Sequence, residues 1–130
     1  MPKTLIKDFD VFKSEFLYWV SYFGLKTWAI DFEHKKLVRS DANISYDTIT
    51  RNATARLNTN MSRKGLELIK ACAFHEVCEL LFAELIVLAE GRSSSLEDIN
   101  VVKHNLIAIF ENTVFLDRGK IENNNKSKAR

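Results

Sequence analysis

The feature that most constrains the fold is a stretch that is apolar on nearly every side of a helix. Residues 77–89 read VCELLFAELIVLA, and they belong to a run from residue 63 to residue 90 that ends before Gly91. The earlier part of this run is amphipathic, so we expect one long helix over residues 63–90. A helix that is apolar nearly all round is buried on most sides. The rest of the chain must therefore pack around it.

The first half of the chain supplies elements that can cover this helix. Bulky apolar residues recur at helical spacing and predict a helix over residues 8–23 with one aromatic face. Residues 27–33 alternate between apolar and polar side chains, which predicts a half-buried strand, and residues 34–36 resemble a turn. Residues 43–47 and the threonine-rich residues 48–59 predict two more strands, so we expect a small antiparallel sheet. The third strand should turn its apolar face to the core at Ile49, Ala53, Ala55 and Leu57.

A second long helix follows the first after a short serine-rich connection. Ser94 and Glu97 have the spacing of a capping box, which predicts a helix over residues 96–116 that ends before Gly119. Its predicted core residues are Val101, Leu106, Ile109, Phe110 and Val114. Because the connection is short, the two long helices should be antiparallel neighbours. The predicted fold class is α+β, with an N-terminal helix, a small antiparallel sheet and then two long antiparallel helices.

Composition places the chain among ordinary soluble domains. Its 130 residues suit one domain, which we assign to residues 1–117, followed by a disordered polar tail over residues 118–130. The net charge of +2 is too small to predict a nucleic-acid partner. Cys72 and Cys78 lie on one predicted helix, and free thiols fit a reducing compartment. We see no signal peptide and no apolar run long enough for a membrane, so we expect a cytoplasmic protein.

The sequence FHEVCELLFAEL places metal-binding side chains on the first long helix. His75 and Glu79 are four residues apart and share a helix face. A carboxylate in such apolar surroundings is costly unless it is paired or bound to a cation. His104, on the second long helix, is expected to face them. Two histidines and one carboxylate form a catalytic zinc set that leaves a position for water, and Glu76 is placed to act as the general base.

Several residues keep alternative interpretations. His75 can instead be a core histidine with Glu76 and Glu79 solvated. Glu111, two turns after His104, is the third ligand in place of His104, a group that orients His104, or a side chain that simply bonds a backbone group. Cys72, one turn before His75, is a possible soft ligand. His34, beside two lysines, is interpreted as a loop residue.

The motif FHEVCELLFAEL, followed by HNLIAIFEN after a helix and a small sheet, resembles the zincin-type metallopeptidases, in particular the small ones encoded by bacteriophages. The resemblance covers roughly residues 28–112. It implies bound Zn²⁺, an edge strand that aligns an extended peptide, and amide hydrolysis by metal-bound water with Glu76 as the base. His75 matches the first ligand of that family, but Glu79 stands where a second histidine is usual.

Two functions follow from these residues. The first is a zinc-dependent hydrolase that acts on a peptide or protein in the cytoplasm of a bacterial host, and the presence of Glu76 favours it. The second is a non-catalytic zincin-like phage protein that binds and inhibits a host or defence protein, and the exchange at Glu79 favours it. The sequence identifies neither the substrate nor the oligomeric state.

Overall fold

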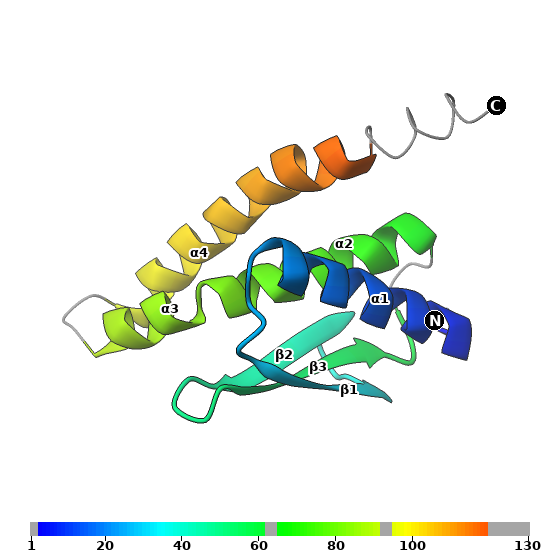
Figure 1. Cartoon of the computed structure of the whole chain (residues 1–130), viewed down its shortest axis with the longest axis horizontal. Helices are drawn as coiled ribbons and strands as arrows, with labels where there is room; N and C mark the ends of the chain where they lie inside the picture. The colour runs from blue at the N-terminus through cyan, green and yellow to red at the C-terminus, as the bar shows by residue number, and fades with distance from the viewer. Residues whose placement is uncertain (1–2, 62–64, 92–94, 120–130) are drawn as a thin grey trace.

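The computed structural model describes residues 3–61, 65–91 and 95–119. Its elements are α1 (Ile6–Tyr22), β1 (Ala29–Lys35), β2 (Ala42–Asp47), β3 (Asn52–Asn58), α2 (Leu66–Leu81), α3 (Ala83–Glu90), α4 (Leu96–Phe110) and a π-helical segment η1 (Glu111–Phe115). The sheet lies on one side of α2 and α4 lies on the other, while α1 packs along α2 (Figure 1). The predicted α+β class, with a helix, a small sheet and then long helices, is confirmed. Within the described residues, no helix has the length and apolar character needed to span a membrane.

The sheet is mixed, so the expectation of a purely antiparallel sheet was wrong. The strand order is β1-β3-β2: β3 pairs in parallel with β1 and antiparallel with β2. The register places Ala53 opposite Ile30 and Ala55 opposite Ile44. The period of two in each strand predicted which side chains face the core, but it holds no information about strand order, because every order leaves the same faces apolar.

The third strand begins later than its alternating pattern suggested. Ala53, Ala55 and Leu57 are buried as predicted, whereas Ile49 is 92% exposed. Asp47 explains the difference, because its Oδ1 accepts a hydrogen bond from the backbone N–H of Ile49 at 2.8 Å and closes a turn before β3. Arg51 ends this turn with a φ of 58°.

His34 lies in β1 and not in a loop. Its Nε2 is 2.6 Å from the hydroxyl oxygen of Thr4, and its ring stacks on Phe9 with centroids 4.9 Å apart. His34 therefore has a structural role on the sheet, and it does not belong to the cluster of possible metal ligands described below.

The main core forms where α1 packs against α2. Phe12, Phe16 and Trp19 of α1 are almost fully buried, as the aromatic face of the predicted first helix required. Trp19 meets Phe74 of α2 edge to face with ring centroids 4.7 Å apart, a geometry that contributes about 1 kcal/mol beyond the area that it buries. Val77 is also fully buried, so one side of α2 is fixed by this contact.

The predicted long helix over residues 63–90 is two helices. A turn at Phe82 separates α2 from α3, and residues 62–64 lie outside the described part of the chain. The Phe82 ring stacks on Phe110 with centroids 6.0 Å apart. Neither proline nor glycine marks this position, so the sequence holds no signal of the break.

α4 presents a different face to the core from the one predicted. Ile107 is fully buried, and Phe110 and Val114 pack against the core as expected. Val101, Leu106 and Ile109 were wrong as core residues, since they are 55%, 37% and 56% exposed. The helix has apolar residues on two sides, so its sequence pattern did not decide which side faces inward.

The ends of this last helix also differ from the expectation. Ser95 is the N-cap, because its hydroxyl accepts from the backbone N–H of Asp98 at 3.1 Å. The predicted cap Ser94 lies outside the described residues. The helix continues through η1 to Gly119 instead of ending at Leu116.

Arg118, which the sequence interpretation assigned to the tail, packs against α1. Its guanidinium pairs with Glu15, whose side chain is 5% exposed, and lies 3.4 Å from the ring centroid of Tyr18. Trp19 donates a second hydrogen bond to Glu15 at 2.8 Å. This arrangement ties the end of the last helix to the first helix, whereas residues 120–130 of the predicted tail lie outside the described residues.

Replacing Arg118 should destabilise the fold. Arg118→Met leaves the buried Glu15 carboxylate without its cation, and we expect the free energy of unfolding in urea to fall by about 3 kcal/mol. The double variant Glu15→Gln/Arg118→Met removes the orphaned charge and should recover most of the loss. Equal stability of wild type and Arg118→Met would contradict this account.

Candidate metal centre

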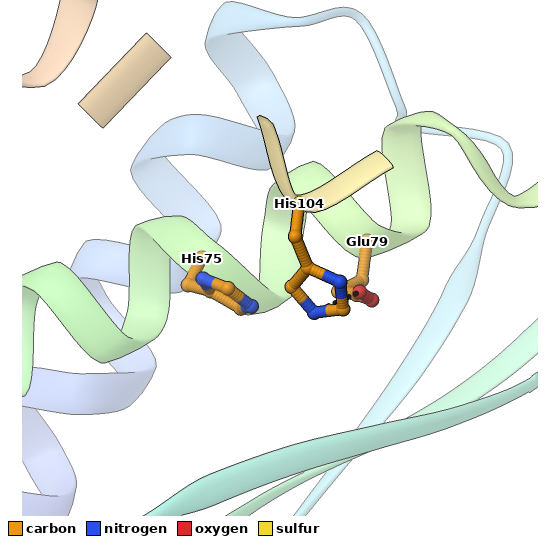
Figure 2. Close-up of side chains that lie close together, drawn as sticks. All are labelled: His75, Glu79 and His104. Carbon is orange, nitrogen blue, oxygen red and sulfur yellow. Dashed lines mark ion pairs between the residues drawn. The ribbon is translucent and has the colours of Figure 1, made fainter. Parts of the chain in front are cut away.

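The three predicted ligands lie together. α2 carries His75 and Glu79, α4 carries His104, and one donor atom from each lies within 4.8 Å of the other two. Figure 2 shows the two α2 side chains on the same side of their helix, with His104 reaching toward them from α4. The structure therefore brings two nitrogen donors and one carboxylate oxygen to one place.

The packing of both helices produces this convergence. Phe74 and Val77 are fully buried, which turns the His75 side of α2 away from the main core. Ile107 of α4 is also fully buried, and His104 lies one turn before it on nearly the same face. The contact that buries Ile107 thus places His104 over α2.

A backbone hydrogen bond orients His104. Its Nδ1 is 2.8 Å from the carbonyl oxygen of Asn100, which can accept only from a protonated nitrogen. Neutral His104 therefore keeps the lone pair on Nε2, which lies 3.9 Å from Oε1 of Glu79. Histidine ligands in metal sites are commonly held by such a bond on the second ring nitrogen.

Glu111 faces His75 from the π-helical segment. Its Oε2 is 3.8 Å from Nδ1 of His75, a distance that describes an ion pair more than a direct hydrogen bond. The Glu111 carboxylate raises the pKa of His75, while burial acts in the opposite direction. The observed ion-pair partner of Glu111 is therefore His75, whereas the sequence interpretation had placed Glu111 as a ligand or as a group beside His104.

The donor set fits a zinc ion. Tetrahedral zinc with bonds near 2.0–2.2 Å separates neighbouring ligand atoms by about 3.4 Å. The 3.9 Å between His104 and Glu79 is wider than this by about 0.5 Å, and the 4.8 Å limit for the whole group is wider by about 1.4 Å, a change within reach of side-chain rotation. Imidazole nitrogen with carboxylate oxygen is also the donor combination found in catalytic zinc sites.

Lys103 is a neighbour of the cluster that the sequence interpretation missed. Its Nζ is 2.9 Å from Oε1 of Glu79, and the two side chains are only 14% and 13% exposed. The ammonium therefore neutralises the Glu79 carboxylate, and any cation bound by Glu79 must share that carboxylate with Lys103 or displace it. The sequence did offer one sign of this contact, because Lys103 directly precedes His104 on the helix that was expected to face α2.

Glu76 borders a hollow of about 220 Å³ next to His75. The hollow is also lined by Cys72, Glu111 and Asp41, the last of which precedes β2. Glu76 is 8% exposed, and burial raises its pKa to about 7. Glu76 thus lies beside the cluster and outside it.

Cys72 lies in this hollow and outside the cluster of donor atoms. Burial raises the pKa of its thiol to about 12, so it is protonated at neutral pH in the metal-free chain. Its position does not bring it among the three donors, so the structure gives it no place in the same donor set.

Comparison with known proteins gives one distant likeness. No family model and no curated protein match the chain. Among solved structures, it is similar to the crystal structure of the metallopeptidase zymogen of Methanocaldococcus jannaschii jannalysin, with 15% identity, a TM-score of 0.44, and coverage of 83% of this chain and 97% of that chain.

The ion pair of Lys103 yields a prediction about metal affinity. In protein treated with a chelator, Lys103→Met should lower the free energy of unfolding by about 2 kcal/mol or more, because Glu79 is left as a poorly solvated carboxylate. Added ZnCl₂ should then stabilise the variant more than the wild type, since zinc no longer competes with the ammonium. Unfolding in urea with chelator or zinc measures both effects.

The matched control is Lys103→Met/Glu79→Gln, which should regain stability without zinc and respond little to it. Identical zinc stabilisation of wild type and Lys103→Met would show that the ammonium does not compete for Glu79.

Proposed function

We propose that the chain is a zinc-dependent hydrolase of the zincin-like type that acts on peptide bonds. The observation that carries this proposal is the convergence of one donor atom from each of His75, Glu79 and His104 within 4.8 Å of the others. His75 and Glu79 come from α2, and His104 comes from α4. Within the described residues, the basic side chains that form an observed ion pair with Glu79 are Lys103 and His104.

Each residue has a role in this proposal. When bound, zinc acts as a Lewis acid toward a carbonyl group and makes water a better nucleophile near neutral pH. His75, Glu79 and His104 hold the ion, and Glu111 orients His75. The Glu76 carboxylate accepts a proton from water in the adjoining hollow and returns it to the leaving amine.

The sheet supports a peptide as the substrate. β2 is an edge strand in the order β1-β3-β2, and Asp41 and Ala42 at its beginning line the same hollow as His75 and Glu76. An extended peptide that pairs with the free edge of β2 gains main-chain hydrogen bonds whatever its sequence. Its backbone would then pass the cluster, so we propose an extended peptide or an unstructured protein segment as the substrate class.

Metal content tests the first part of the proposal. Protein expressed without a histidine tag in zinc-supplemented medium should hold about one zinc per chain by elemental analysis. His75→Ala and His104→Ala should each lose most of it, whereas His34→Ala, which removes the histidine on the sheet, should retain it. Metal-free wild type would sink the proposal, and retention by His104→Ala alone would move the third ligand to Glu111.

A second function is supported by one observation. The ammonium of Lys103 already neutralises Glu79, which is the arrangement expected if the site needs no metal. In this second proposal the chain is a non-catalytic phage protein that binds and inhibits a host or defence protein in the bacterial cytoplasm. The exposed face of the sheet, where Arg56 contacts Glu33, Asn43 and Ser45, is then the candidate contact surface.

Glu76→Gln distinguishes the two functions. The variant keeps the size of the side chain and removes the base, so zinc content and fold should persist while cleavage of an unstructured protein falls by about 10²-fold or more. One preparation is assayed for zinc, for cleavage and for recovery of partners from bacterial lysate. Equal cleavage by wild type and Glu76→Gln would contradict the role of Glu76. Absence of cleavage by both, together with a partner whose binding is lost in Arg56→Glu, would favour the second function.

A further inference from the structure

One end of the molecule is organised by a buried asparagine at the end of β3. Asn58 is 4% exposed, and its side-chain oxygen accepts hydrogen bonds from the backbone N–H groups of Leu37 and Asn60 at 3.1 and 3.0 Å. Its side-chain nitrogen donates to the carbonyl oxygens of Leu37 and Ser40 at 3.0 and 2.9 Å. Asn58 therefore fixes the connection between β1 and β2 on both sides of its tip.

The tip of this connection exposes an apolar side chain among cations. Val38 is 94% exposed, and Arg39 beside it is also exposed, as are Lys35 and Lys36 before it. A single exposed apolar residue is ordinary on a protein surface. Here, however, a buried side chain uses both of its donors and its acceptor oxygen to hold the tip in one conformation. The exposure of Val38 is therefore specified by the fold.

The start of the first helix is tied to the same end by a second buried group. The hydroxyl of Thr4, a residue that is 7% exposed, donates to the carbonyl oxygen of Asn58 at 2.8 Å and lies 2.6 Å from Nε2 of His34. The backbone N–H of Thr4 donates to the carbonyl oxygen of Thr59 at 2.9 Å. Accordingly, α1 starts at the end of the molecule where β1 and β3 finish and β2 begins (Figure 1).

The exposed side chains at this end include a group of cations and two apolar residues. The cations are Lys3, Lys7, Lys35, Lys36 and Arg39. The two apolar residues are Ile6 and Val38, which are 77% and 94% exposed. We call these seven residues the basic end. Within the described residues, none of its five cations forms an observed ion pair, whereas Lys13, Arg51 and Arg56 elsewhere on the chain each do.

The carboxylates that flank these cations along the chain have other neighbours. Glu33 pairs with Arg56 at 2.9 Å. Asp8 is 9% exposed, and its Oδ2 accepts a hydrogen bond from the backbone N–H of Leu5 at 2.7 Å. Asp41 lines the hollow beside the metal cluster. The positive charge of the basic end is therefore available to a partner outside the chain.

The combination of cations with protruding apolar side chains fits the surface of an anionic lipid bilayer. Lysine and arginine side chains are attracted to the negative headgroups of such a surface, and each adds to the binding. An apolar side chain among them gains by burial at the boundary between headgroups and acyl chains. The phosphates of a nucleic acid would attract the same cations but offer no apolar layer to Val38 and Ile6. A protein partner would need a separate apolar pocket for each of these two side chains.

We propose that the basic end binds reversibly to bilayers that contain anionic lipids, with Val38 entering the headgroup region. A contact of this kind needs no membrane-spanning helix, and none is found among the described residues. It agrees with the expected compartment, because the cytoplasmic leaflet carries anionic lipids. The proposal does not rest on the metal cluster, whose residues His75, Glu79 and His104 lie on α2 and α4.

Sedimentation with lipid vesicles tests the role of charge. The full chain should bind at least about tenfold better to vesicles with phosphatidylglycerol and phosphatidylcholine than to phosphatidylcholine alone, and salt should weaken this binding. Lys36→Glu should lower the binding by about tenfold. The matched control is Lys26→Glu, which makes the same charge change at an exposed position outside the basic end and should bind within about twofold of wild type.

A second pair of variants tests the insertion of the apolar tip without changing the net charge. Val38→Ser should weaken binding to the anionic vesicles by about threefold or more. Ile49→Ser, at a 92% exposed position on the turn at the other end of the sheet, should not. Both sites are exposed, so the circular dichroism of both variants should match that of wild type. Equal binding of wild type to both kinds of vesicle would overturn the proposal, as would equal effects within either pair of variants. Preferential binding to double-stranded DNA at the same phosphate concentration would also reject a bilayer as the partner.

Discussion

The arrangement of this protein depends on the enclosure of α2. Its Phe74 and Val77 are locked against the aromatic residues of α1, the sheet covers another side, and Ile107 brings α4 over the remaining face. This enclosure leaves one short polar strip, on which His75 and Glu79 stand one turn apart. A site at this place needs no dedicated loop, because the same contacts that form the core position its side chains.

The polar strip gathers several acidic side chains. Glu76, Glu79 and Glu111 all act to raise the pKa of His75, and the ammonium of Lys103 pairs with Glu79. Such a group of partly desolvated carboxylates is costly unless a cation joins it. Zinc is one solution to this imbalance, and a protonated His75 with Lys103 is another. The two proposed functions differ in which of these solutions the protein uses.

The sequence predicted the parts of the site that depend on helical spacing. The four-residue step from His75 to Glu79 determined their shared face, and the short connection before α4 made His104 their neighbour. The rotation of α4 could not be predicted, because its apolar residues occupy two faces and only packing selects Ile107. Lys103 was missed for the same reason, since its approach to Glu79 depends on that rotation. The order of the strands could not be predicted, because the alternation of apolar and polar residues shows which face of a strand is buried and not which strands are neighbours.

The π-helical segment Glu111–Phe115 sets the direction of every described residue that follows it. A π-helical turn accommodates one residue more than an α-helical turn. If the same residues formed an uninterrupted α-helix, the residues after this segment would be turned by about 100° about the helix axis. Arg118 would then leave Glu15, although every residue that forms that contact would still be present. A homologous chain with a regular α-helix here should therefore have one residue fewer if it keeps this contact.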